Sequence, residues 1–206
     1  PAPFWASYPD MAKLSGAIPV IIKSTIDNNF KIDASSLEKA ISEKTRMFLL
    51  NSPSNPSGSN YTKSELEEIS EVLVKHPEIL IVSDDIYEHI FWGSETFANI
   101  INVCEKLYER TIVVNGVSKA YSMTGWRIGY AGGPEKIIKE MKKIQSQSTS
   151  NPNSIAQAAA VSALNEKQDF IKDCVNTFKD RHDFLIKTLE KIDGMRVLKS
   201  EGTFYS

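Results

Sequence analysis

The sequence predicts an α/β protein with a mostly parallel sheet and helices on both faces of that sheet. Short apolar runs rich in β-branched residues alternate along the chain with segments of helical periodicity, which is the pattern of α/β folds. The apolar runs lack a clear alternation of apolar and polar positions, as expected for strands that are covered on both sides. We expect strands over residues 20–22, 47–50, 79–82 and 111–114.

The helices between these strands are predicted from end signals and apolar spacing. Thr62 and Glu65 have the spacing of a capping box, ahead of a helix that runs through Val74. Pro134 suits the first turn of another helix, because the N–H that proline lacks is not needed there. We also expect helices over residues 35–42 and 100–108, and a polar, proline-interrupted loop over residues 145–154.

A long helix is predicted over residues 168–192, and Gly194 is placed to end it. Apolar residues fall along one stripe of this helix, which predicts a single buried face. The stripe consists of Ile171, Cys174, Val175, Phe178, Leu185 and Leu189.

Residues 195–198 and 201–205 have the composition of strands, directly after the long helix. Because such a helix often leads into another domain, we divide the chain into a large domain over residues 1–192 and the start of a smaller domain over residues 193–206. On this interpretation the chain is a piece of a longer protein, truncated at both ends.

The composition excludes several classes of function. The 206 residues carry a formal charge of −2, with basic and acidic residues nearly balanced, so the chain has no electrostatic attraction for nucleic acid or an anionic membrane. No apolar run approaches the length of a membrane span, and the N-terminal residues lack the features of a signal peptide. Cys104 and Cys174 are far apart, without the spacing of a zinc site or a disulfide framework. We expect a cytoplasmic protein with no metal site and no nucleic-acid or membrane partner.

The most informative motif is Ser118-Lys119, and Arg127 lies eight residues after Lys119. An amine that can form a Schiff base, followed by a guanidinium that can clamp a phosphate, is what a pyridoxal phosphate enzyme needs. A Ser-Lys pair in a loop is by itself an ordinary solvated pair, so this interpretation depends on the other motifs.

Two polar clusters follow predicted strands, where an α/β fold places its ligands. In the cluster over residues 51–58, Asn55 is either a turn former or an amide donor to an anionic oxygen. In the cluster over residues 83–89, Asp84 either caps a helix or faces a protonated ring nitrogen, and Tyr87 can donate to an oxygen of the same ring.

Two aromatic residues are weaker candidates. Trp5 can stack on an aromatic cofactor, although an aromatic residue near a chain end more often belongs to a core. His89 is expected to support the site or the fold rather than to act as a catalyst.

In this order, Asn55, Asp84, Tyr87, Lys119 and Arg127 resemble the fold type I (class I) pyridoxal phosphate-dependent aminotransferases, in particular the bacterial aspartate aminotransferases. The motifs are Asn-x-Pro-x-Asn-Pro-x-Gly, Asp-x-x-Tyr, and Ser-Lys with the later arginine. In that family the matching lysine holds the cofactor as an imine and the aspartate contacts the pyridine nitrogen. The asparagine and tyrosine contact the ring hydroxyl, and the arginine binds the phosphate.

The resemblance also implies that Trp5 stacks on the ring and that Ser118 contacts the phosphate. It implies a ping-pong transamination in a homodimer, with aspartate expected as the amino acid and 2-oxoglutarate as the 2-oxo acid. The freed amine of Lys119 would be the general base, favoured by its proximity to the carbon that loses a proton. Asp84 would keep the ring nitrogen protonated, so that the ring accepts electrons.

Four alternatives stay open or are weaker. A carbon–sulfur lyase on the same scaffold would share Lys119, Asp84 and Arg127, and the chain could also be an isolated domain without activity. A nicotinamide dehydrogenase is disfavoured because no G-x-G-x-x-G follows the first strand. A nucleotide phosphate-binding loop is disfavoured because no glycine stands immediately before Lys119.

Overall fold

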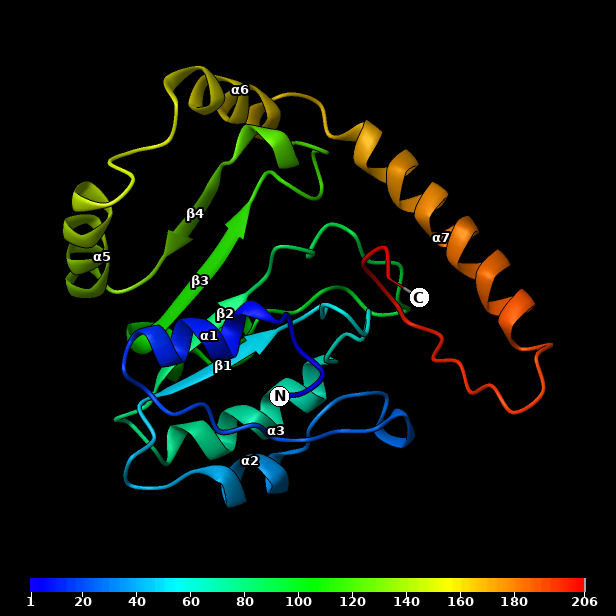
Figure 1. The fold of residues 1–206 in the computed structure, drawn as a ribbon, viewed down its shortest axis with the longest axis horizontal. Helices are drawn as coiled ribbons and strands as arrows, with labels where there is room; N and C mark the ends of the chain where they lie inside the picture. The colour runs from blue at the N-terminus through cyan, green and yellow to red at the C-terminus, as the bar shows by residue number, and fades with distance from the viewer. Residues whose placement is uncertain (206) are drawn as a thin grey trace.

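The computed structural model describes residues 1–205, and its sheet has the strand order β1-β2-β3-β4 (Figure 1). Strands β1 (Met47–Asn51), β2 (Leu80–Asp84) and β3 (Thr111–Gly116) are parallel, and β4 (Gly129–Gly132) is antiparallel to β3. The predicted mostly parallel α/β sheet is confirmed. Because β1, β2 and β3 run the same way, the polar residues that follow them meet at one edge of the sheet.

The main core lies between this sheet and α3 (Lys63–Val74), beside α2 (Ala34–Ala40) (Figure 1). Leu66, Ile69 and Leu73 of α3 are each at most 1% exposed and pack with apolar residues of β1 and β2. The predicted capping box is present at the start of α3, where the Thr62 side chain accepts from the Glu65 N–H and the Glu65 side chain accepts from the Thr62 N–H. The predicted helix over 100–108 consists of α4 (Ile100–Val103) and a 3₁₀ segment, η2 (Glu105–Arg110).

Three helices form an arc around the end of the sheet made by β3 and β4, away from α2 and α3 (Figure 1). They are α5 (Glu135–Gln147), α6 (Ser154–Asn165) and α7 (Asp169–Leu189). Ala156 and Ala160 of α6 belong to a second, smaller core with Val117, Met123 and Ile128. This core fixes the connection between β3 and β4, which carries the Ser-Lys motif.

The three other elements among the described residues are a helix and two 3₁₀ turns. Helix α1 (Ser7–Leu14) precedes a 3₁₀ turn, η1 (Ile26–Asn28), and a further 3₁₀ turn, η3 (Thr124–Trp126), precedes β4. The chain after α7 returns as an extended segment to the carboxyl ends of the strands (Figure 1).

The prediction of a strand over residues 20–22 is wrong. This segment is extended but is not part of the sheet, and Val20 is 68% exposed. Its Ile22 carbonyl accepts a hydrogen bond from the Ala2 N–H. β-branched residues favour a strand only where a neighbouring strand provides packing and backbone partners, and here the neighbour is the irregular N-terminal segment.

The C-terminal predictions are also corrected. Residues 195–198 form no strand, and within residues 201–205 Gly202 makes only an isolated antiparallel bridge to Phe91. Helix α7 ends at Leu189, five residues before Gly194, which adopts φ of +79° in the following turn. The buried residues of α7 are His182 and Ile186, which are not among the residues of the predicted stripe but lie on the same face of the helix, four residues after Phe178 and after His182.

Candidate active site

Asp84 is the last residue of β2, and its carboxylate is held in place by two donors. The Tyr8 hydroxyl donates to Oδ2 over 2.6 Å, and the Ile86 N–H donates to Oδ1 over 3.2 Å. Burial raises the pKa of Asp84, while both hydrogen bonds oppose that rise. The carboxylate is oriented but carries no ion pair within the described chain, which suits it to bind a cationic group.

Asn51 connects the ends of β1 and β2. Its side-chain amide donates to the Asp84 backbone carbonyl over 2.8 Å, and its side-chain oxygen accepts from the Asn55 N–H over 2.7 Å. The pairing of Asn51 with Asp84 in the strand register makes both contacts possible. The loop that carries Asn55 is thereby fastened to the strand that carries Asp84.

Tyr87 is buried one turn after Asp84, with 2% of its surface exposed. Its hydroxyl shares a 2.9 Å hydrogen bond with the Tyr205 hydroxyl, and the Asn55 side chain also bonds to it. Burial and the Tyr205 hydrogen bond raise the pKa of Tyr87, and the Asn55 contact lowers it. Tyr87 therefore stays protonated and keeps a proton to donate.

Lys119 lies beside Tyr87, in the connection between β3 and β4. Its Nζ is 5.8 Å from the centroid of the Tyr87 ring and 5.5 Å from the centroid of the Phe204 ring. Within residues 1–205, no carboxylate lies within salt-bridge distance of this amine. The partly buried amine faces aromatic rings rather than a counter-ion.

Arg127 enters the site from the other end of the same connection. Gly116 pairs with Gly129 in the β3–β4 ladder, which brings the two ends of the connection together and sets Lys119 and Arg127 on one loop. The Arg127 guanidinium is exposed, donates to the Thr124 carbonyl over 2.9 Å, and has no carboxylate partner in the described chain. Its other donors are available to an anion.

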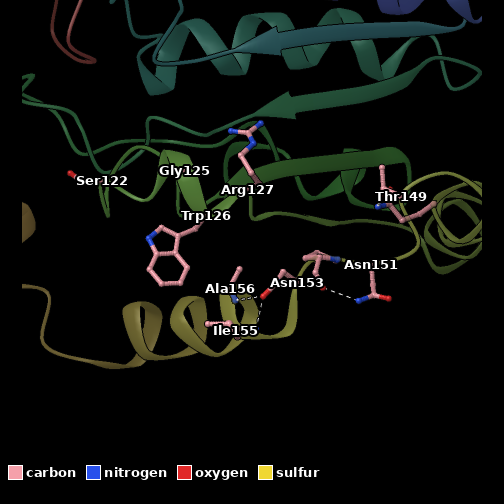
Figure 2. Close-up of a pocket in the computed structure, with 11 residues that line it drawn as sticks. Ser122, Gly125, Trp126, Arg127, Thr149, Asn151, Asn153, Ile155 and Ala156 are labelled. Carbon is pink, nitrogen blue, oxygen red and sulfur yellow. Dashed lines mark hydrogen bonds between the residues drawn. The ribbon is translucent and has the colours of Figure 1, made fainter.

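Arg127 and Trp126 line a pocket of about 770 Å³ next to the start of α6. Figure 2 shows the Arg127 guanidinium and the Trp126 indole pointing in opposite directions, with the indole toward α6. Asn153 caps α6 by accepting hydrogen bonds from the N–H groups of Ile155 and Ala156. The capped first turn of α6 therefore forms one part of the pocket wall.

The remaining candidates lie at the margin of this arrangement. Trp5 is 42% exposed and packs edge-on against Tyr8, with ring centroids 5.4 Å apart. The Ser118 carbonyl accepts a hydrogen bond from the Thr124 hydroxyl. His89 is exposed, with its Nε2 3.4 Å from Glu88, away from the group around Asp84.

The comparisons with known proteins place the whole chain in one family. The family model described as aminotransferase class I and II matches residues 1–206. The chain belongs to this aminotransferase family.

Individual members of the aminotransferase family are similar along the whole chain. An aspartate/prephenate aminotransferase from Nitrosomonas europaea is 54% identical over all 206 residues, which cover 52% of that protein. The solved aspartate aminotransferase from Rhizobium meliloti is 47% identical with a TM-score of 0.95, over 98% of this chain and 51% of that one. An aromatic aminotransferase structure from Pyrococcus horikoshii is 33% identical with a TM-score of 0.94, and covers 98% and 54% of the two chains. The chain spans about half the length of these relatives.

Two residues of this candidate site could not be predicted from the sequence. Tyr8 and Tyr205 contact Asp84 and Tyr87 from positions 76 and 118 residues away in the chain. The only local signal for Tyr8 is its spacing of three residues from Trp5, which lies just ahead of α1. No local signal points to Tyr205.

Two structural findings bear on the other classes of site. In the part of the chain that the structure describes, no helix is long and apolar enough to cross a membrane. The same residues contain no group of three or more His, Cys, Asp or Glu side chains that could hold a metal ion.

Proposed function

We propose that the protein to which this chain belongs is a pyridoxal phosphate-dependent aminotransferase. The observation that carries the proposal is the position of the Lys119 amine over the ring of Tyr87, which follows the oriented carboxylate of Asp84 by three residues. The amine and the carboxylate are each without an ion-pair partner among the described residues, and groups left in this way are typical of functional sites.

The residues present fit this cofactor. Asp84 offers an oriented carboxylate to a protonated ring nitrogen, and Tyr87 with Asn55 offers hydrogen bonds to a ring oxygen. Arg127 offers free guanidinium donors to a phosphate. When bound, pyridoxal phosphate supplies an aldehyde carbon for covalent attachment of an amine and a ring that accepts an electron pair.

Asp84 and Lys119 have different roles in the proposed reaction. Asp84 would stabilise positive charge at the ring nitrogen; burial raises its pKa, and its hydrogen bonds from Tyr8 and Ile86 favour the ionised form against that effect. Lys119 would hold the cofactor covalently through Nζ, and the same atom would take the proton from the substrate α-carbon.

Three further residues complete the proposed cofactor site. Arg127 binds the phosphate, and Ser118 contributes a polar contact next to Lys119. Trp5 stacks on the cofactor ring, since its packing against Tyr8 places it beside the side chain that holds Asp84.

Aspartate is the proposed amino donor and 2-oxoglutarate the proposed acceptor, in a ping-pong reaction. Several similar proteins are named aspartate/prephenate aminotransferases, which supports aspartate and adds prephenate as an acceptor to test. We also propose a cytoplasmic homodimer, with residues 1–192 in the large domain and residues 193–206 at the start of the small domain.

The test uses the full-length protein loaded with pyridoxal phosphate. Oxaloacetate formed from aspartate and 2-oxoglutarate is measured with a coupled dehydrogenase, and prephenate replaces 2-oxoglutarate in a parallel assay. Borohydride reduction followed by peptide mapping identifies the modified lysine. Amino transfer together with labelling of Lys119 is expected. Release of a sulfur product from a cysteine-type substrate without amino transfer would identify a lyase instead.

A further inference from the structure

Residues 200–205 form a segment that is bound to the two loops carrying Asn55 and Tyr87. The Trp92 indole N–H donates to the Ser200 carbonyl, and the Trp92 backbone N–H donates to the Glu201 carbonyl. The Thr203 N–H donates to the Ile90 carbonyl over 2.7 Å. Residues 200–205 are therefore held against the loop after β2 by backbone and side-chain hydrogen bonds, although the two segments are far apart in the sequence.

The fit between this segment and the loop after β1 leaves no room for a side chain. A Cβ added to Gly58 would lie 2.6 Å from the side chain of Ser200 and 2.8 Å from the Gly202 carbonyl oxygen. The Glu201 N–H donates to the Gly58 carbonyl across the same contact. Close backbone approach of this kind fixes the path of the segment.

Thr203 turns the segment toward the site. It is fully buried and adopts φ of +67°, a left-handed conformation that a β-branched residue rarely takes. Its hydroxyl accepts a hydrogen bond from the Tyr205 N–H. A strained residue of this kind persists where its surroundings hold it, and here it directs the two aromatic residues that follow.

Both aromatic residues reach the proposed catalytic groups. The Phe204 ring lies edge-on to Tyr87 with centroids 5.5 Å apart, and it covers the Lys119 amine. The Tyr205 ring lies 5.9 Å from the Tyr87 ring, and the two hydroxyls are 2.9 Å apart.

The hydrogen-bonding capacity of Tyr87 gives this contact a function. A phenol hydroxyl donates once and can accept twice. Asn55 donates to the Tyr87 oxygen and occupies one accepting position. Either hydroxyl can be the donor across the 2.9 Å contact between Tyr205 and Tyr87. When Tyr87 donates to Tyr205, the bond raises the pKa of Tyr87. When Tyr205 donates into the second accepting position instead, the Tyr87 proton is left for a third partner.

We propose that Tyr205 is a positioning residue, which donates to the Tyr87 hydroxyl and thereby directs the Tyr87 proton toward the oxygen of the cofactor ring. This inference rests on the proposed function. The segment after α7 would then contribute to cofactor binding indirectly, because the Tyr205 hydroxyl contacts Tyr87 and not the cofactor.

The test is a double-mutant cycle in the full-length protein, with the variants Tyr205→Phe, Tyr87→Phe and both together. The dissociation constant of pyridoxal phosphate is measured by fluorescence titration for each protein. Tyr205→Phe keeps the ring and removes only the hydroxyl, and we expect it to weaken binding by roughly three- to tenfold. In the Tyr87→Phe background the same change is expected to alter binding by less than about twofold, because its partner is already gone.

Tyr108→Phe is the matched control, since Tyr108 is 58% exposed in η2. Urea unfolding of the cofactor-free proteins checks that every variant folds, and it supplies a second cycle that measures the coupling between the two hydroxyls. An equal loss of affinity in both backgrounds, or no loss on Tyr205→Phe, would overturn the inference while leaving the proposed function intact. Failure of the unmodified protein to bind pyridoxal phosphate would overturn both.

Discussion

The Tyr8 hydroxyl donates a 2.6 Å hydrogen bond to the carboxylate of Asp84, which joins α1 to the end of β2 across 76 residues of sequence. The bond lowers the pKa of Asp84 against the effect of burial, and the neighbouring carboxylate raises the pKa of Tyr8. The bond thus favours the ionised form of Asp84, while burial first and Asp84 second favour the protonated form of Tyr8. The proposed role of Asp84 at the ring nitrogen depends on this hydrogen bond.

Tyr8→Phe is expected to shift the pH profile of the enzyme. Loss of the donor raises the pKa of Asp84 further, so the acid limb of kcat/KM moves to higher pH. Removing a hydrogen bond to a charged group costs about 1.5–3 kcal/mol, so kcat/KM near neutral pH should fall by roughly tenfold or more. The measurement is a pH–rate profile beside Tyr108→Phe, and an unmoved acid limb would show that Tyr8 does not act through Asp84.

Asp84→Ala is expected to reduce turnover by orders of magnitude while the protein still folds. Removing one member of a buried charge pair costs about 3–5 kcal/mol, which is a factor of roughly 10² to 10³ or more in rate. Asp10→Ala is the control, because the Asp10 side chain is 72% exposed. Steady-state assays and thermal unfolding of both variants make the comparison, and near-normal turnover of Asp84→Ala would refute the role of this carboxylate.

Arg127→Lys is expected to weaken cofactor retention by about tenfold. Lysine keeps the charge but loses the planar pair of donors that suits a phosphate. Dialysis followed by absorption measurement of the remaining cofactor tests this. Arg46→Lys is a matched control, because Arg46 is also bound only to backbone carbonyls, those of Glu43 and Thr45. Equal retention in the two variants would count against a phosphate contact by Arg127.

Asp85→Asn is expected to flatten the pH dependence of stability. Asp85 accepts hydrogen bonds from Ser83 and Asn99, yet burial raises its pKa from 3.8 to about 6. The folded protein therefore binds the proton more tightly than the unfolded chain. This contribution to the free energy of unfolding is fully present below about pH 4 and is lost as the pH rises through about 6.

The variant has no such titration, and a shift of about two pKa units corresponds to roughly 3 kcal/mol. The difference in unfolding free energy between pH 4 and pH 7 should shrink by up to about that amount. Urea unfolding of the full-length protein over this range, with Asp10→Asn as control, measures it. Parallel curves for Asp85→Asn and the unmodified protein would contradict the prediction.

Arg110→Met is expected to destabilise the fold by roughly 2–3 kcal/mol. The Arg110 guanidinium donates to the Leu73 carbonyl at the end of α3 and to the His76 and Ile79 carbonyls of the turn before β2. Methionine fills similar space but leaves these carbonyls without their donors. Urea unfolding beside Arg181→Met, an exposed arginine of α7, measures the effect, and similar losses in both would show that the three bonds contribute little.

Much of the site was predictable because its residues follow strands. Asp84 is the last residue of β2, and Asn55 and Lys119 follow the ends of β1 and β3 within four residues. Parallel strands bring their carboxyl ends to one edge of the sheet whatever the rest of the chain does. The spacing between Lys119 and Arg127 could also be predicted from the sequence, because both residues lie in the connection between β3 and β4. The roles of Trp5 and Ser118 stay predictions.

The sequence by itself determined the α/β pattern, the capping box of α3 and the residue types at the strand ends, since each is set by periodicity or by neighbours within about four residues. Only the tertiary structure decided that residues 20–22 lie outside the sheet and that α7 buries His182. It also brought Tyr8 to Asp84 and Tyr205 to Tyr87. Such contacts depend on which surfaces meet after folding, and hydroxyl groups 76 and 118 residues from their partners leave no periodic trace in the sequence.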